Sequence, residues 1–153
     1  MRNRYAEAGA VARLHILQLI VAMAVPRVLE DGVLLAARVL LSTIFLHEAA
    51  VLLAAGNFAA TAAALGIPAA LFLATIALQL VAGLAILTGG YTRLGAAALG
   101  GFCLATAVLF HTNFGVRNEL LHFEKDLAIA GGMFALMVHG PGGWSLDRHL
   151  GRR

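Results

Sequence analysis

Four long apolar stretches, separated by short breaks, dominate the pattern of hydrophobic and polar positions along the chain. They cover residues 33–55, 68–88, 94–113 and 121–139. Each has about 20 residues, the length that an α-helix needs to cross the hydrocarbon core of a bilayer. The pattern therefore predicts an all-α integral membrane protein built as a four-helix transmembrane bundle.

Helix-ending residues punctuate these stretches. Pro68 stands at the first turn of the second stretch, where the missing N–H of proline has no helical partner to lose. Glycines follow the first and second stretches, and a Pro-Gly-Gly sequence at 141–143 follows the fourth. Trp144 comes directly afterwards and is placed to anchor the chain at a membrane interface.

The chain divides into three parts on this pattern. Residues 1–32 precede the first stretch, and their apolar segment at 14–25 is too short to span a bilayer. We expect an interfacial helix on the cytoplasmic face there. Residues 33–140 form the four-helix transmembrane domain, and residues 141–153 are expected to form a cytoplasmic tail.

The overall composition supports a membrane protein and excludes other classes. Hydrophobic residues make up 61% of the chain and charged residues 12%, with a mean hydropathy of +0.87. A soluble domain of this size could not bury so much apolar surface. The single cysteine, Cys103, forms neither an internal disulfide nor a dithiol pair. No basic stripe with interleaved aromatic residues appears, so nucleic acid is not an expected partner.

The basic residues predict the orientation. With the amino terminus in the cytoplasm, all but three of them fall on the inner side, which is the positive-inside pattern for an even number of spans. Arg117 and Lys125 lie near the outer face, and Arg38 lies within the first helix, where we expect it to snorkel toward the inner headgroups. The inner set comprises Arg2, Arg4, Arg13, Arg27, Arg93, Arg148, Arg152 and Arg153.

The polar residues inside the apolar stretches concentrate in the predicted outer half of the bundle. An ionised side chain at a helix centre costs about 2.5–3.5 kcal/mol, so such residues are candidates for function. We take five residues as candidate catalytic groups, and three as candidate cofactor ligands. The catalytic set is His47, Glu48, Gln79, His111 and Asp126, and the cofactor-binding set is Gln79, His47 and Lys125.

Two kinds of site suit these residues, and the sequence does not decide between them. His122 and Asp126 are four residues apart and share a helical face, a spacing that suits two ligands of one metal. Alternatively, a histidine or Gln79 holds a quinone carbonyl while Glu48 or Asp126 passes protons to the outer aqueous phase. We assign no metal ligands and retain a quinone as the candidate cofactor.

A purely structural interpretation has equal weight. Lys125 would neutralise Glu48 or Asp126 as an interhelical polar lock, with the histidines hydrogen-bonded between them. Small residues at four-residue spacing also predict close helix packing, and Gly101 lies in such a stripe with Ala97 and Ala105.

Several segments resemble the DoxX family of membrane proteins. The resemblance lies in LLAARVLLSTIFLH at 34–47, LGIP at 65–68, QLVAGLAILTG at 79–89, FEKDLAIAGG at 123–132 and GPGGWSLD at 140–147. It covers about residues 33–148. The sequence departs from the family at Gln79, where a glutamate is frequent, at Asp126, where asparagine is usual, and at Glu48, where a small residue is expected.

The resemblance implies a four-helix protein of the bacterial inner membrane, and some relatives are subunits of thiosulfate:quinone oxidoreductase or belong to complexes that handle thiols or oxidants. We therefore expect an accessory or quinone-interacting subunit of a membrane oxidoreductase, with a partner protein carrying the redox centre. The alternative is a non-catalytic module that recruits or stabilises partner proteins, and a transporter ranks third. Whether the chain is itself an enzyme, and whether it forms a homo-oligomer, stay open.

Overall fold

The computed structural model describes residues 26–151, and the expected interfacial helix before residue 26 lies outside them. The chain divides into two compact units, Met1–Glu30 and Asp31–Arg153. The second unit contains every side-chain contact of the site described below.

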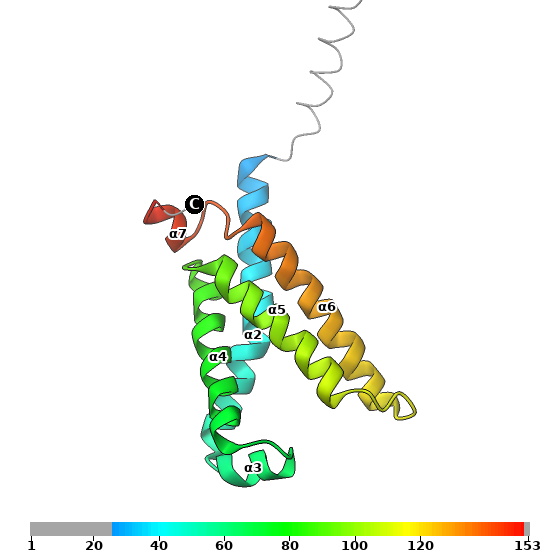
Figure 1. Ribbon diagram of the computed structural model, residues 1–153. Coiled ribbons are helices and arrows are strands. Elements are labelled where there is room, and N and C mark those ends of the chain that lie inside the picture. The colour runs from blue at the N-terminus through cyan, green and yellow to red at the C-terminus, as the bar shows by residue number, and fades with distance from the viewer. Residues whose placement is uncertain (1–25, 152–153) are drawn as a thin grey trace, which may run out of the picture. The chain divides into compact units, whose positions relative to one another are not determined.

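All regular structure in the described residues is helical (Figure 1). The four long helices are α2 (Arg27–Ala55), α4 (Ala69–Thr88), α5 (Thr92–Phe110) and α6 (Arg117–His139). Two short helices accompany them: α3 (Phe58–Ala64) lies between α2 and α4, and α7 (Leu146–His149) follows α6. The four predicted stretches therefore correspond to the four long helices, and the two short helices were not expected from the pattern.

Three of the described helices, α2, α4 and α5, are long and apolar enough to cross a membrane. The fourth expected span, α6, is long enough at 23 residues, but charged residues crowd its first turns. Its apolar part begins at Leu127 and runs to the end of the helix. Since α6 packs along α5 more extensively than any other pair of helices in the described residues, it completes a bundle of four long helices.

Apolar side chains and glycines fix the bundle. One core cluster joins α2, α4, α5 and α6 around Phe45, Ile86, Leu99 and Met133. Glycines permit close approach between helices: Gly83 of α4 faces the side chain of Leu46 so closely that an added Cβ would lie 2.9 Å from it. This is the small-residue packing expected between membrane helices.

The small-residue stripe expected to mediate packing on α5 does not face the core. An added Cβ at Gly101 would meet nothing within 4 Å, and Ala105 is exposed. The inward glycines of α5 are Gly95 and Gly100 instead. The prediction was wrong in its choice of face because four-residue spacing occurs on every side of a helix rich in alanine and glycine.

Arg38 does not snorkel as expected but is buried, with 2% of its surface exposed. Its guanidinium donates hydrogen bonds to the carbonyl oxygens of Ile86 (3.0 Å) and Leu87 (3.0 Å), in the last turn of α4. It also donates to the carbonyl oxygens of Pro141 and Trp144, each at 2.8 Å. Helix ends leave carbonyls without helical partners, and the five N–H donors of arginine satisfy them better than headgroup contact would.

Candidate functional site

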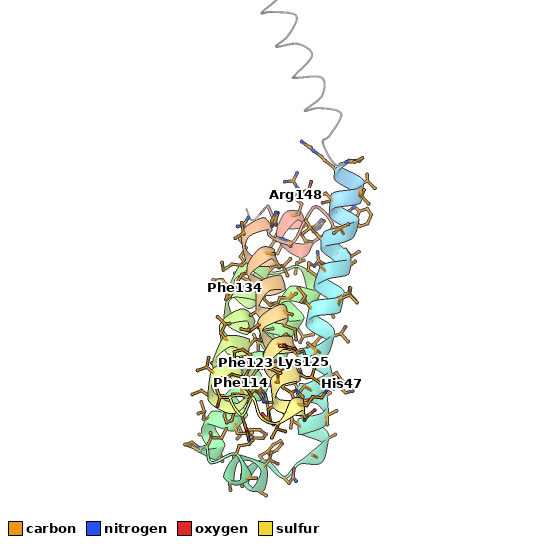
Figure 2. All side chains as sticks on the ribbon, turned by 90° about the vertical axis from the view of Figure 1, so that its right-hand side faces the viewer. His47, Phe114, Phe123, Lys125, Phe134 and Arg148 are labelled. Carbon is orange, nitrogen blue, oxygen red and sulfur yellow. The ribbon has the colours of Figure 1, made fainter. Side chains whose placement is uncertain are left out.

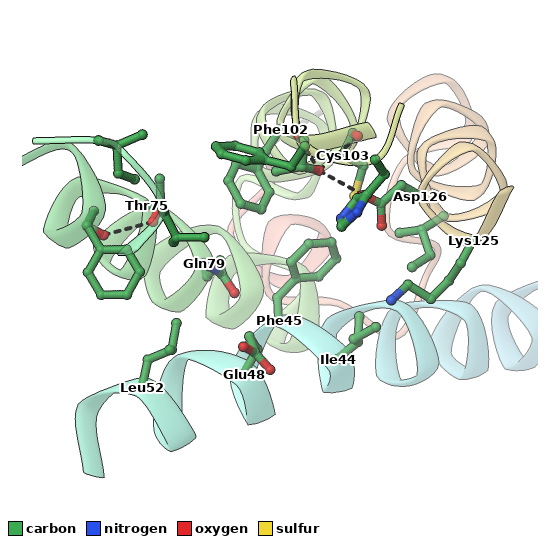
Figure 3. A pocket seen from close by; sticks show the side chains of 17 residues that line it. Ile44, Phe45, Glu48, Leu52, Thr75, Gln79, Phe102, Cys103, Lys125 and Asp126 are labelled. Atoms are coloured by element: carbon green, nitrogen blue, oxygen red, sulfur yellow. Dashed lines mark hydrogen bonds between the residues drawn. The ribbon is translucent and has the colours of Figure 1, made fainter. Parts of the chain in front are cut away.

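A cavity of about 350 Å³ lies among α2, α4, α5 and α6 (Figure 3). Aromatic and aliphatic side chains form most of its wall, including Phe45, Phe72, Phe102 and Ile129. Ligand pockets of proteins fall in the range of about 300–1,000 Å³ and are mostly apolar with a few convergent polar groups. The cavity has this character, and its volume suits a single-ring ligand.

Five of the residues predicted from the sequence line this cavity, one or more from each of the four long helices or their ends. They are Glu48 of α2, Gln79 of α4, His111 at the end of α5, and Lys125 and Asp126 of α6. The bundle thus brings together residues that are far apart in the sequence. Figure 3 shows Gln79 and Glu48 on one side of the cavity and Asp126 and Lys125 on the other.

His47 is the exception among the predicted site residues. It is exposed on α2 and does not line the cavity, whereas its neighbour Glu48, about 100° around the helix, does. Among the residues that the structure describes, none makes a hydrogen bond or an ion pair with His47. Figure 2 shows it on α2 at the same end of the bundle as Lys125.

Gln79 has the most unusual environment of the set. The residue is only 4% exposed. No hydrogen bond joins its amide to any other described residue, whereas buried polar groups in proteins are almost always bonded. The amide faces the cavity (Figure 3). A buried amide without a partner, aimed into a cavity, is a polar group available to a ligand.

Asp126 is held by α5. The hydroxyl of Thr106 lies 2.9 Å from its Oδ2 and donates to it. This bond joins α5 to α6 beside the cavity, where Thr106 itself forms part of the wall. The same hydroxyl also lies 3.1 Å from the carbonyl oxygen of Phe102 and 3.0 Å from that of Cys103, so its single proton is shared between its own helix and Asp126. Sequence reasoning missed the contact with Asp126, because a threonine in a membrane helix usually bonds only its own helix.

The His111 end of the bundle holds a histidine–carboxylate contact that the sequence did not indicate. Nδ1 of His111 lies 2.8 Å from Oε2 of Glu119. The ring of His111 stacks on that of His122, with centroids 5.1 Å apart and planes inclined by 22°. Glu119 is the functional candidate that sequence reasoning missed, since the path of the loop before α6 decides which residue meets His111.

The polar-lock interpretation expected Lys125 to pair with Glu48 or Asp126. In the structure, Lys125 pairs with neither. Its Nζ lies 2.9 Å from Nδ1 of His122 instead, one turn away on the same helix. In the part of the chain that the structure describes, no three His, Cys, Asp or Glu side chains are grouped to hold a metal ion. The metal alternative built on His122 and Asp126 therefore has no support in these residues.

The sequence matches the DoxX family over residues 33–112, which is more than half of the chain. The protein belongs to this family and is a multi-pass membrane protein. It is similar to two inner membrane proteins of Escherichia coli strain K12: YqjF, 43% identical over 59% of this chain and 69% of YqjF, and YphA, 36% identical over 56% of this chain and 66% of YphA. No solved structure matches. The family and the inner-membrane character of the relatives confirm the resemblance seen in the sequence.

Proposed function

We propose that this protein is a quinone-interacting accessory subunit of a membrane oxidoreductase, and that the cavity holds the quinone headgroup. The observation that carries the proposal is Gln79, a residue only 4% exposed whose amide has no hydrogen-bond partner in the described residues and faces a mostly apolar cavity. A ligand carbonyl in the cavity would supply the missing hydrogen bond to this amide.

The cavity offers a binding mode for both parts of a quinone. The amide N–H of Gln79 would donate to one carbonyl, and the ammonium group of Lys125 would approach the other from the opposite wall. Ile44 and Leu65 line the cavity and are also exposed on the outside of the bundle. This apolar edge suits an isoprenoid tail that leaves toward the lipid.

The acidic groups of the cavity suit proton exchange. Glu48 and Asp126 lie in its wall and would carry protons between the ligand and the aqueous phase. By the positive-inside distribution of the arginines, both termini are cytoplasmic and the cavity lies in the outer half of the membrane.

The electron-transfer centre would belong to a partner protein. The chain has a single cysteine and therefore no Cys pair for dithiol redox chemistry of its own. The resemblance to the DoxX family implies that some relatives are oxidoreductase subunits. This is consistent with a redox centre on a partner protein.

The second candidate function is a non-catalytic module that recruits or stabilises a partner. One observation favours it: the hydrogen bonds of Thr106 to Asp126 and of His111 to Glu119 join α5 to α6, which makes part of the polar cluster a structural link. On this alternative the cavity has no ligand of its own.

Titration calorimetry of the detergent-solubilised protein with ubiquinone-1 and menadione tests the proposal. We expect wild type to bind at least one of them and Gln79→Leu to bind about tenfold more weakly, as for the loss of about 1.4 kcal/mol. The matched control is Thr88→Val, a loss of polarity on the same helix at an exposed hydroxyl that bonds only its own helix. Equal affinity in Gln79→Leu and wild type, or no binding by wild type, contradicts the proposal.

A further inference from the structure

The two stacked histidines at the edge of the cavity have charged partners of opposite sign. His111 presents Nδ1 to the carboxylate of Glu119 at 2.8 Å, and His122 presents Nδ1 to the ammonium of Lys125 at 2.9 Å. The rings themselves lie 5.1 Å apart, nearly parallel. Each histidine therefore has one ring nitrogen committed to a bond and the other nitrogen left over.

The partners determine which nitrogen carries a proton. An ammonium group can only donate hydrogen bonds, so Nδ1 of His122 must be an acceptor, and the proton of the neutral ring lies on Nε2. An ionised carboxylate can only accept, so Nδ1 of His111 must carry a proton. The bond made by one ring nitrogen thus sets the state of the other, and the two rings hold opposite tautomers.

We infer that His111 is a proton acceptor in the wall of the cavity and that Glu119 is its positioning residue. With Nδ1 protonated, Nε2 of His111 has a free lone pair. When a ligand hydroxyl is deprotonated, its O–H bond breaks, an N–H bond forms at Nε2 of His111, and the electron pair stays on the oxygen. The resulting imidazolium would be stabilised by the carboxylate of Glu119.

The position of the pair suits this role. His111 lines the cavity, yet its side chain is 25% exposed and that of Glu119 is 31% exposed. The dyad therefore extends from the cavity wall to the surface of the protein, where a proton can pass to water. His122 does not line the cavity.

The other charged groups that line the cavity form no hydrogen bond with His111. Glu48 of α2 and Asp126 of α6 share the wall with it, and Asp126 is bonded to Thr106 of α5. Cys103 of α5 also lies in the wall, and α4 contributes the uncharged Gln79. Of the titratable described groups, Glu119 alone has a carboxylate within hydrogen-bond distance of the His111 ring.

The tautomers can be read directly, without any ligand, from nitrogen NMR of protein labelled with ¹⁵N-histidine. The signals are assigned with His111→Gln and His122→Gln. At mildly alkaline pH we expect His111 to carry its proton on Nδ1 and His122 to carry it on Nε2. The opposite tautomer in His111, or the same tautomer in both rings, overturns the inference.

Two variants on α6 separate positioning from general packing. Glu119→Leu should remove the preference of His111 for the Nδ1-protonated form, because the carboxylate that imposes it is gone. Glu124→Leu is the matched control, since Glu124 is an exposed acid on the same helix, and it should leave the His111 signals unchanged. If Glu119→Leu keeps the wild-type tautomer, Glu119 is not the positioning residue.

The role of His111 toward a ligand rests on the proposed function and needs its own measurement. Ubiquinol-1, kept reduced under argon, is titrated in two buffers of different ionisation enthalpy, which gives the protons exchanged on binding. His111→Gln should still bind through Gln79 but lose the exchange of protons. Unchanged exchange in this variant overturns the assignment. Correct tautomers with no ubiquinol binding would instead contradict the quinone site and leave the dyad standing.

Discussion

Arg38 and Asp147 hold the turn between α4 and α5 from its two sides. Arg38 donates to the last carbonyls of α4, while the carboxylate of Asp147 accepts from the backbone N–H groups of Tyr91 (3.0 Å) and Thr92 (3.3 Å) at the start of α5. A cation at a helix C-terminus and an anion at a helix N-terminus each interact favourably with the helix dipole. The two charges also attract each other. The segment after α6 is therefore part of the folded unit.

Replacing Arg38 should destabilise the protein severely. Arg38→Met leaves four carbonyl oxygens without their donor, and we expect the free energy of unfolding to fall by about 3–5 kcal/mol. Arg38→Lys should recover only part of this loss, because an ammonium lacks the planar fork of five donors. Thermal unfolding in detergent measures the effect.

The control for this prediction is Arg148→Met. Arg148 is exposed at the C-terminal end of the described chain (Figure 2), and its removal should change the unfolding free energy by no more than about 0.5 kcal/mol. Comparable losses in Arg38→Met and Arg148→Met would show that the carbonyl contacts of Arg38 do not stabilise the bundle.

The two charges at the turn should also be coupled energetically. Asp147→Ala removes an acceptor for two N–H groups at a helix start, which typically costs about 0.5–2 kcal/mol. We expect the double variant with Arg38→Met to lose less stability than the sum of the single losses, since both act on one turn. Strict additivity in chemical or thermal unfolding would refute this coupling.

Adjacent glycines on α5 give a test of packing. A Cβ at Gly100 would lie 2.9 Å from the ring of Phe134 and 3.2 Å from Cβ of Met133, whereas a Cβ at Gly101 meets nothing within 4 Å. Gly100→Ala should therefore lower the stability by about 1–3 kcal/mol through overpacking. Gly101→Ala should be neutral or slightly stabilising, because alanine favours a helix over glycine. A reversal of this order in thermal unfolding would contradict the helix packing described.

Gln79 should favour function at the expense of stability. In the absence of a ligand, Gln79→Leu replaces an amide that has no protein partner with an apolar side chain of similar size. We expect the unfolding free energy to rise by up to about 1 kcal/mol, because an apolar side chain suits a mostly apolar cavity better than an amide does. A fall in the melting temperature of the ligand-free variant would mean that the amide has a partner in the folded protein.

The lengths and positions of the apolar stretches predict much of the fold. The four long helices lie where the hydrophobic stretches predict them, and Thr88 ends α4 as expected. The start of α2 at Arg27 and of α6 at Arg117 lies earlier than predicted, since polar residues can extend a helix beyond its apolar part. Hydropathy alone carries no signal for such an extension.

The sequence predicted most of the residues of the site but not the arrangement of their side chains. Helical position placed Gln79, Glu48 and Asp126 in one half of the bundle, and the structure brings all three to one cavity. The rotation of each helix about its own axis decides which side chains point inward, and this excluded His47. The bond of Glu119 to His111 depends on the loop between α5 and α6, whose path has no periodic pattern in the sequence.

Native mass spectrometry shows whether the cavity at Gln79 holds a quinone in the membrane. The protein is extracted gently from its own membranes, and wild type is compared with Gln79→Leu. We predict a wild-type species carrying one quinone, with the variant largely free of it. A wild-type protein that carries no quinone, or a variant that carries as much as wild type, would contradict the claim and favour a role as a structural module.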